Sequence, residues 1–560
     1  MKLRFLIFLL LLFNLNISLA VDSGNYLAGR YALSNKDYDS AINFFEKSID
    51  INKIDPEKQK DDLDVSKELC TLYLLKGQIN KCVFIAKKFE DYLKQESVEI
   101  LLALTVYDIK NRNFDSALEK IKKIQKDSYE RYSIPIIEAW LIAIEKKNYK
   151  KSIETINELK KDFAINGLRY LHIALINDYF EKYEEANIFY EKSINSYISP
   201  SFRLVQLVGN YYERMGEKEK AKKLYLKFIE SDNDEILISN EINRLDKNIV
   251  PKKQIINVSD ALSELFTNIA STFRSDFTNR YSIIYTNFSL YLKNDYEIAL
   301  MYLAELLETD SKFFLANQIY DKIPPRSVFY WHARIRKARN LEILGNNKNA
   351  VLLLNKMTEE KKTRYDTLQL LGDILRNYEK YEEAIGVYNK AISRIQEIDE
   401  NHWDLLYSRG IAYERSNQWE NAETDFLKVL NFVPDQPEVL NYLGYSWIEK
   451  GLNIEKAKEF LIKAYKLRPN DPYIVDSLGW AYYKLQDYDK AIIELEKAVS
   501  LKPTDPIIND HLGDVYEKKE RNLEAFFQWK KALDFEPDKK LKNQIEKKLK
   551  KFSDNSSINF

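Results

Sequence analysis

Hydrophobic residues recur at helical spacing along most of the chain, and short polar turns separate the periodic stretches. In the N-terminal half this pattern is visible in NKDYDSAINFFEKSI, NRNFDSALEKIKKI, EKYEEANIFYEKSI and GEKEKAKKLYLKFI. Apolar positions three or four residues apart form one stripe on an α-helix, whereas a half-buried strand would alternate apolar and polar residues. Each segment is therefore predicted to be a turn followed by an amphipathic helix, with Ala41, Ala117, Ala186 and Ala221 at equivalent positions.

In the C-terminal half the pattern becomes a clear repeat. Gly410, Gly444, Gly479 and Gly513 follow one another at a nearly constant spacing of about 34 residues, and Gly372 precedes them. Around these glycines an aromatic residue, an alanine and a proline return at fixed offsets: Tyr413, Trp447, Tyr482 and Tyr516; Ala384, Ala422, Ala457, Ala491 and Ala525; Pro434, Pro469, Pro503 and Pro537. This period and these marks are typical of the tetratricopeptide repeat, a pair of antiparallel helices.

The offsets have a physical reason. Two helices approach closely only where small residues meet, so we expect the glycine of the first helix to face the alanine of the second. The aromatic residue then fills the space beside this contact. Proline ends the second helix because it lacks an N–H and restricts the residue before it.

The predicted fold is an all-α superhelical solenoid of antiparallel helix pairs, with roughly 11 to 13 repeats, degenerate in the N-terminal half. We expect a signal peptide at 1–20, degenerate repeats at 21–245, a joint at 246–280, a C-terminal array at 281–537, and a capping helix with a tail at 538–560. The joint is placed where no repeat aligns and where Pro251 interrupts the pattern.

Composition agrees with long amphipathic helices. Gly (14) and Pro (13) are scarce among 560 residues, and 31% of residues are charged, which disfavours a turn-rich β architecture. Lys plus Arg (85) and Asp plus Glu (86) nearly cancel, so no global field indicates a nucleic-acid partner.

The N-terminal segment, 1–20, differs from the rest of the chain. Lys2 and Arg4 precede an unbroken apolar run from Phe5 to Phe13, and small residues stand at Ser18 and Ala20. This pattern predicts a cleavable secretory signal. A retained membrane anchor is the alternative, but the apolar run is shorter than the ~20 residues that a bilayer span needs. Nothing later in the sequence indicates a membrane segment. We therefore expect an exported protein, periplasmic or associated with the cell envelope.

Cys70 and Cys82 are the two cysteines, and they occupy the positions that Gly and Ala hold in other repeats. A disulfide that pins this helix pair is geometrically feasible in an oxidising compartment. The alternative is that each cysteine serves as a small apolar residue.

No motif in the sequence indicates catalysis. The four histidines (His172, His332, His402 and His511) lack metal-ligand spacing, and the chain has neither a Gly-rich phosphate loop nor a Gly-x-Ser-x-Gly elbow. We expect no cofactor, no metal and no enzyme activity.

The remaining functional surface is the concave side of the solenoid, formed mainly by the first helix of each repeat. Counting from the glycines, the residues expected to face this groove are Asn441, Tyr445, Asp476, Trp480, Tyr483, Asp510, Asp514 and Glu517. Aromatic rings beside carboxylates suit an extended or helical peptide of basic character. The alternative is that Trp480 and Tyr483 pack between repeats while the acids are solvated.

A basic run follows Pro324-Pro325 and forms a second candidate surface. It comprises Arg326, Arg334, Arg336, Lys337 and Arg339. The run could receive an acidic partner, but we favour a connector whose arginines are solvated or paired with acids.

The motifs RGIAYER, LNYLGYSWIEKG, IVDSLGWAYYKL and INDHLGDVYEKK resemble the C-terminal block of exported, notably alphaproteobacterial, tetratricopeptide-repeat proteins. The resemblance implies a protein-binding scaffold or adaptor of the bacterial envelope. Relatives of this kind include the lipoprotein adaptor of a C-terminal processing protease, but the lipid-attachment cysteine is missing here, which puts tethering in doubt. A self-assembling structural solenoid is the alternative function, and an enzyme is the less favoured one.

Overall fold

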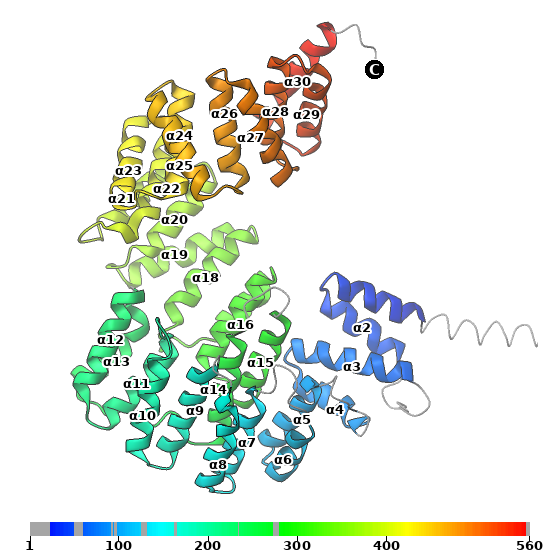
Figure 1. Ribbon diagram of the computed structural model, residues 1–560, viewed down its shortest axis with the longest axis vertical. Helices are drawn as coiled ribbons and strands as arrows, with labels where there is room; N and C mark the ends of the chain where they lie inside the picture. The colour runs from blue at the N-terminus through cyan, green and yellow to red at the C-terminus, as the bar shows by residue number, and fades with distance from the viewer. Residues whose placement is uncertain are drawn as a thin grey trace, which may run out of the picture. The chain divides into compact units, whose positions relative to one another are not determined.

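The computed structural model describes residues 23–49, 60–90, 93, 98–124, 132–161, 165–232, 235–272 and 279–555. The expected signal peptide, 1–20, lies outside these residues, as does the end of the expected tail. Within the described ranges the secondary structure is helical, with no strand. The chain divides into two compact units, unit 1 up to Gly345 and unit 2 from Asn346 (Figure 1).

Unit 1 begins with a helix at 23–34 and continues as successive antiparallel pairs. Its further helices are α2 (Tyr38–Ser48), α3 (Lys60–Leu75), α4 (Ile79–Ala86), α5 (Val98–Lys110), α6 (Phe114–Lys123), α7 (Ile134–Ile144), α8 (Tyr149–Ile156), η5 (Asn157–Lys161), α9 (Asn166–Tyr179), α10 (Tyr183–Ile194), α11 (Phe202–Arg214), α12 (Lys218–Asp232), α13 (Glu235–Asp246), α14 (Val258–Ala270), α15 (Asn279–Leu292), α16 (Glu297–Thr309), α17 (Phe313–Tyr320) and α18 (Tyr330–Ile343).

Unit 2 contains the regular repeats. Its helices are α19 (Asn347–Glu360), α20 (Asp366–Asn377), α21 (Tyr381–Ile392), η7 (Glu400–His402), α22 (Trp403–Arg415), α23 (Trp419–Phe432), α24 (Pro437–Lys450), α25 (Ile454–Leu467), α26 (Pro472–Lys484), α27 (Tyr488–Leu501), α28 (Pro506–Lys518), α29 (Asn522–Asp534) and α30 (Lys539–Asn555). The pairs α20–α21, α22–α23, α24–α25, α26–α27 and α28–α29 pack as hairpins. The predicted all-α solenoid of helix pairs is confirmed.

The turn inside a pair is closed by one residue in the left-handed conformation. Asn417, Gln486 and Glu520 take this place in unit 2, with φ of 63°, 62° and 59°. In the turn after α26, Gln486 N–H donates to Tyr483 O at 2.9 Å, and the next N–H donates to Tyr482 O at 2.9 Å. These bonds satisfy carbonyls that the helix end leaves open.

The close contact inside each pair differs from the expected one. A methyl group added at Gly410 would lie 2.6 Å from the Phe426 ring, and one at Gly513 would lie 2.5 Å from Trp529. The glycine therefore makes room for a large side chain one turn beyond the alanine, rather than for the alanine itself. The expected Gly–Ala contact is thus corrected, because the alanine, although fully buried in both pairs, is not among the nearest atoms.

The same arrangement holds at the other pairs. Gly372 faces Tyr388, and Gly479 faces Leu495. At Gly444 the nearest atoms belong to Leu461, and the carbonyl oxygen of Ala457 follows at 3.0 Å. The prolines Pro434, Pro469 and Pro503 each lie just after the last residue of α23, α25 and α27, and Pro537 follows α29.

The segment expected to be a joint, 246–280, belongs to unit 1. It includes α14, which pairs with α15, and both helices pack against α5, while α14 also contacts α7 and α15 contacts α3 (Figure 1). Asn287 on α15 donates to the Leu74 and Leu75 carbonyls at 2.8 and 3.2 Å. The chain therefore returns to its own first repeats, since Asn287 and Leu74 are 213 residues apart in sequence.

Candidate partner-binding groove

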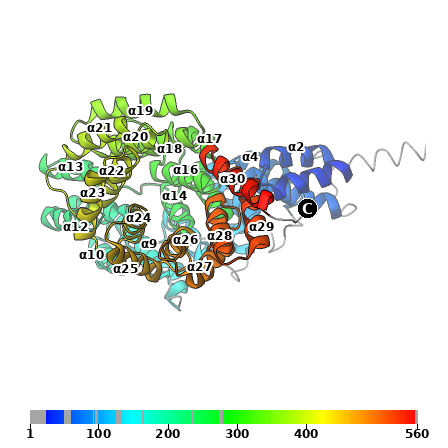
Figure 2. The same cartoon turned by 90° about the horizontal axis from the view of Figure 1, so that it is seen from above.

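The groove candidates lie on three neighbouring first helices of unit 2. Asn441 and Tyr445 are on α24; Asp476, Trp480 and Tyr483 on α26; Asp510, Asp514 and Glu517 on α28. They stand three residues before, one after or four after the repeat glycine, which places them on one helix face. Because α24 contacts α26 and α26 contacts α28, the three faces adjoin (Figure 2).

A buried stack links α26 to α28. The His511 ring lies 3.9 Å from the Trp480 ring at 15°, and Tyr483 stacks on Trp480 at 4.6 Å. His511 Nδ1 lies 3.0 and 3.1 Å from the two Asp476 carboxylate oxygens. Burial disfavours the imidazolium, but the carboxylates of Asp476, Asp510 and Asp514 together outweigh burial and raise the pKa of His511. Asp476 and Trp480 therefore both take part in contacts between neighbouring repeats.

Glu449 connects α24 to the same stack. Trp480 Nε1 donates to Glu449 Oε1 at 2.8 Å, and Lys484 Nζ lies 3.0 Å from that oxygen. Burial would raise the pKa of Glu449, but the bonds from Trp480 and Lys484 lower it. The carboxylate is thus held ionised at the exposed edge of α24.

The three acids of α28 already bind a basic helix of the same unit. Lys548 on α30 donates to Asp510 Oδ1 and Oδ2 at 2.8 and 2.9 Å, and lies 2.6 Å from Asp514 Oδ1. Lys551 lies 3.9 Å from Glu517. Burial, reinforced by Asp514, raises the pKa of Asp510 despite Lys548. The last helix, α30, is therefore held against α28 partly through these carboxylates.

Asn441, Tyr445, Tyr483 and Glu517 remain partly exposed. The Oδ1 atom of Asn441 is buried and has no hydrogen-bond partner among the described residues. Burial raises the pKa of both tyrosines, to about 12 for Tyr483. The groove thus offers two phenol rings, an amide and a carboxylate to a partner.

Three contributors were not among the predicted groove residues: His511, Glu449 and Lys548. His511 and Asp476 are 35 positions apart, close to one repeat, so the repeat register could have indicated their pairing. Lys548 carries no such signal, because its helix follows the last repeat.

The corresponding face of unit 1 is covered by its own chain. Asn210 on α11 donates to Lys252 O at 3.0 Å, and Lys253 Nζ donates to Asp178 O on α9 at 2.8 Å. Arg203 bonds Glu264 on α14 at 2.7 to 2.8 Å. Together with α14 and α15, the segment around residues 252–257 lies across several first helices of unit 1.

Cys70 and Cys82 are free, buried thiols at facing positions of α3 and α4. Cys70 Sγ donates to the Cys82 carbonyl oxygen at 3.2 Å. Burial, with the hydrogen bond to Cys70, raises the pKa of Cys82 well above its ordinary value. The pair sits where Gly and Ala stand in regular repeats.

The basic run after Pro324-Pro325 is largely engaged within unit 1. Arg336 contacts Glu308 at 2.7 Å and Glu305 at 3.3 Å, and Lys337 contacts Asp321 at 2.5 Å. Arg334 is buried. These contacts agree with the connector interpretation.

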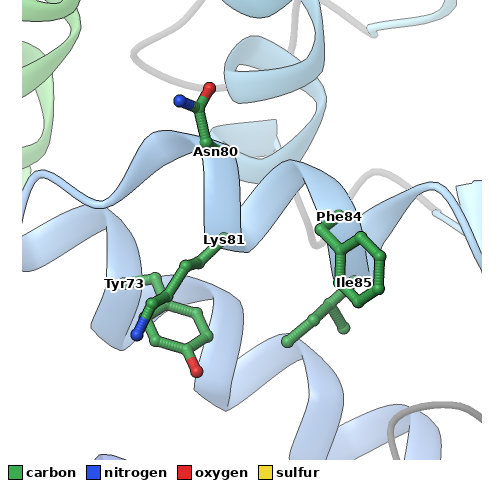
Figure 3. Close-up of a pocket in the computed structure, with 5 residues that line it drawn as sticks. All are labelled: Tyr73, Asn80, Lys81, Phe84 and Ile85. Carbon is green, nitrogen blue, oxygen red and sulfur yellow. The ribbon is translucent and has the colours of Figure 1, made fainter.

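Other features of the described ranges give no further site of this kind. No group of His, Cys, Asp and Glu in these ranges could hold a metal ion. None of the described helices is long and apolar enough to cross a membrane. A shallow pocket on α3 and α4 is lined by Tyr73, Asn80, Lys81, Phe84 and Ile85 (Figure 3). Asn80 Oδ1 also accepts from Tyr291 Oη at 2.6 Å.

Comparison with known proteins identifies the repeat. The tetratricopeptide-repeat family matches residues 23–55, 202–235 and 365–397, and a related TPR-repeat family matches residues 479–520. A TPR repeat-containing protein of Pseudomonas aeruginosa is 29% identical over 194 residues, which cover 34% of this chain and 32% of that protein. The match therefore spans about a third of the relative's length.

Solved structures with similar architecture are more distant. The Cut9–Hcn1 hetero-tetramer of the APC/C contains a chain with 14% identity and a TM-score of 0.39, covering 95% of this chain and 96% of that one. A tetratricopeptide-repeat protein from Parabacteroides merdae has 16% identity and a TM-score of 0.38, covering 45% of this chain and 97% of its own. The matched segments lie in both units, so both units contain tetratricopeptide repeats.

Proposed function

We propose that the chain is a non-enzymatic scaffold that holds a protein partner in the groove of unit 2, through a basic extended or helical segment. The observation that carries the proposal is the seating of Lys548 on Asp510 and Asp514. It shows that the carboxylates of this face accept an ammonium presented by a helix. Tyr445, Tyr483 and Glu517 continue the same face and are partly exposed.

We place the partner on unit 2 rather than on unit 1 because a segment of the chain already covers the corresponding face of unit 1. In unit 1 the polar groups of the first helices, such as Asn210 and Asp178, already bind residues 252–253. An incoming segment would have to displace these bonds. In unit 2 the last helix, α30, occupies Asp510 and Asp514 on α28, whereas Tyr445 on α24 and Tyr483 on α26 remain partly exposed.

The test is affinity capture with the chain from residue 21 onward, followed by mass spectrometry and by direct binding of the purified partner. The groove variant combines Tyr483→Ala with Glu517→Lys, because neither residue belongs to the buried His511–Asp476 or Lys548–Asp510 pairs. The matched control, Ile493→Ala with Glu459→Lys, makes the same kind of changes on exposed positions of α27 and α25.

We expect the groove variant to lose the partner and the control to retain it. Loss in the control alone would move the site to the second helices and contradict the proposal. Equal binding by all three proteins would also contradict it. If light scattering of the protein alone gives a molar mass that rises with protein concentration, the result would instead support the self-assembling solenoid.

We also propose that the protein works in the cell envelope after removal of residues 1–20. The basic start, the apolar run and the small residues before Val21 support this location. Intact-mass measurement on fractionated cells tests it. An unprocessed chain recovered from the cytosol would overturn this part of the proposal, and an unprocessed chain in the membrane fraction would indicate the retained anchor.

A further inference from the structure

A cleft in unit 1, remote in sequence from the groove, combines an apolar floor with a charged rim. The rim carries three lysines, Lys36, Lys76 and Lys312, beside the carboxylates of Asp37 and Asp39. The cleft has a volume of about 330 Å³, at the small end of ligand pockets. Its walls come from the start of α2, the end of α3, and α15, α16 and α17, which the return of the chain brings together. The cleft is therefore a product of the tertiary fold rather than of one repeat.

The floor is aliphatic. Leu75, Ile283 and Leu303 are buried and line the cleft together with Leu307 and Ile319. An apolar chain placed here would remove aliphatic surface from water, which is favourable.

The rim is built around the ammonium group of Lys312. Its Nζ lies 3.7 Å from the centre of the Tyr38 ring and 3.8 Å from Asp310 Oδ2, too far for a hydrogen bond. Among the described residues it makes no hydrogen bond, although an ammonium carries three donors. Lys36 likewise reaches Asp310 only at 3.6 Å, whereas Lys76 is bonded to Asp39 at 2.8 Å.

The surroundings of Lys312 disfavour its charged form. Its side chain is 21% exposed, and burial, with Lys76 and Lys36 opposing Asp310 and Asp39, lowers the pKa of Lys312. A carboxylate bound at the rim would supply both an acceptor and a charge of the opposite sign.

We propose that this cleft binds an aliphatic carboxylate, with its hydrocarbon chain on Leu75, Ile283 and Leu303 and its carboxylate on Lys312. A medium-chain fatty acid fits this chemistry, because the ligand must present one anionic end to Lys312 and a flexible apolar body to a small apolar floor. The proposal concerns unit 1 and is independent of partner binding in unit 2.

Calorimetric titration of the full chain with octanoate, octanol and acetate tests the two halves of the site. Octanoate should bind, octanol should bind at least tenfold more weakly, and acetate should not bind at the same concentrations. Acetate binding as tightly as octanoate would overturn the apolar half, and octanol binding as tightly would overturn the carboxylate half. If a peptide with a C-terminal leucine displaces octanoate and binds more tightly, the cleft still binds an aliphatic carboxylate. Its ligand would then be the C-terminus of a peptide.

Variants locate the site. Lys312→Gln should weaken octanoate at least tenfold, whereas Lys322→Gln, at an exposed lysine of the same unit outside the cleft, should not. Gln318 lines the cleft and is exposed, so its substitutions should not disturb folding. Gln318→Glu should weaken octanoate and Gln318→Lys should strengthen it. Equal affinities for these two variants would overturn the proposal even if Lys312→Gln failed to fold.

Discussion

At the scale of single residues, Gly479 sets the separation of α26 and α27. A methyl group at this position would lie 2.7 Å from Leu495 Cγ and 3.2 Å from the Leu495 backbone nitrogen. The backbone cannot rotate away as a side chain can, so we expect Gly479→Ala to lower the free energy of unfolding by about 1–3 kcal/mol. Urea unfolding followed by circular dichroism measures the change.

Gly386 provides the matched control for this substitution. It lies in α21 with no atom within 4 Å of an added methyl group. Gly386→Ala should raise the free energy of unfolding by about 0.5–1 kcal/mol, because alanine restricts the unfolded chain and favours helix. A destabilisation equal to that of Gly479→Ala would show that close contact is not the cause.

The two cysteines give a second prediction at this scale. Since Cys82 is fully buried with a raised pKa, little Cys82 thiolate is available for oxidation. We expect two thiols per chain in the denatured, unreduced protein, and slow alkylation in the native protein. Fewer than two thiols would restore the disulfide hypothesis.

At the scale of elements, the helix pairs could be predicted because each repeat carries its own signals. The positions of Gly410, Gly444 and Gly513 mark first helices, and the prolines mark the ends of second helices. The closest contacts of Gly410 and Gly513 were predicted wrongly, because a helix diagram does not show that the residue one turn beyond the alanine reaches the glycine.

The candidate site was less predictable than the fold. Register places Asp476 and Asp510 on one face, but it does not show that His511 and Lys548 already bind them. The packing of α15 on α3 joins Asn287 to Leu74, 213 residues away in a degenerate part of the chain, and no local pattern indicates it. Long-range pairing of this kind depends on surface complementarity rather than on periodicity.

The last helix, α30, gives a prediction at this scale. Ile545 is fully buried against the core of the last repeat, and Lys548 pairs with Asp510 and Asp514. Lys548→Met should leave the buried Asp510 without its ammonium and cost about 1–3 kcal/mol. Hydrogen exchange of α28 and α30 should accelerate.

Lys547→Met is the control, because Lys547 is the exposed neighbour on the same helix. It removes the same charge and adds the same apolar surface without touching α28. Equal acceleration in both variants would mean that net charge, rather than the Lys548 contacts, holds α30.

At the scale of the whole molecule, the two units should respond to pH in opposite directions. In unit 1, burial lowers the pKa of His172 to about 4, and its Nδ1 accepts from Trp140 Nε1 at 3.0 Å. A histidine in the unfolded chain has a pKa of about 6.5, so acid protonates the unfolded state first. His172 therefore makes unit 1 less stable as the pH falls below about 6.5, and the free energy of unfolding decreases by about 2 kcal/mol near pH 5.

This acid response can be read from hydrogen exchange of α7 and α9 peptides in the full chain, corrected for the intrinsic pH dependence of exchange. His172→Gln keeps an acceptor for Trp140 but cannot be charged, so it should flatten the response. If the variant is as acid-sensitive as the parent, carboxylates rather than His172 control unit 1.

Unit 2 has the reverse linkage because of the His511–Asp476 pair. The pKa of His511 is raised in the folded state, since the Asp476 carboxylate, with Asp510 and Asp514, outweighs burial. The contribution is complete below about pH 6.5 and is lost as the pH rises through the raised value. Exchange of α26 and α28 should therefore accelerate as the pH rises above about 6.5, relative to exchange of α7 and α9.

The chemistry of the groove connects this response to partner binding. Loss of the imidazolium leaves Asp476 beside a neutral ring and removes one positive charge that faces Asp510 and Asp514, so the face becomes more acidic while α26 and α28 loosen. A basic partner should therefore be attracted more strongly but meet a less rigid surface. The pH dependence of its affinity measures the net effect. His511→Gln removes the titration, so partner affinity in this variant should become flat across the same pH range. If parent and variant change alike with pH, the titrating groups belong to the partner rather than to the groove.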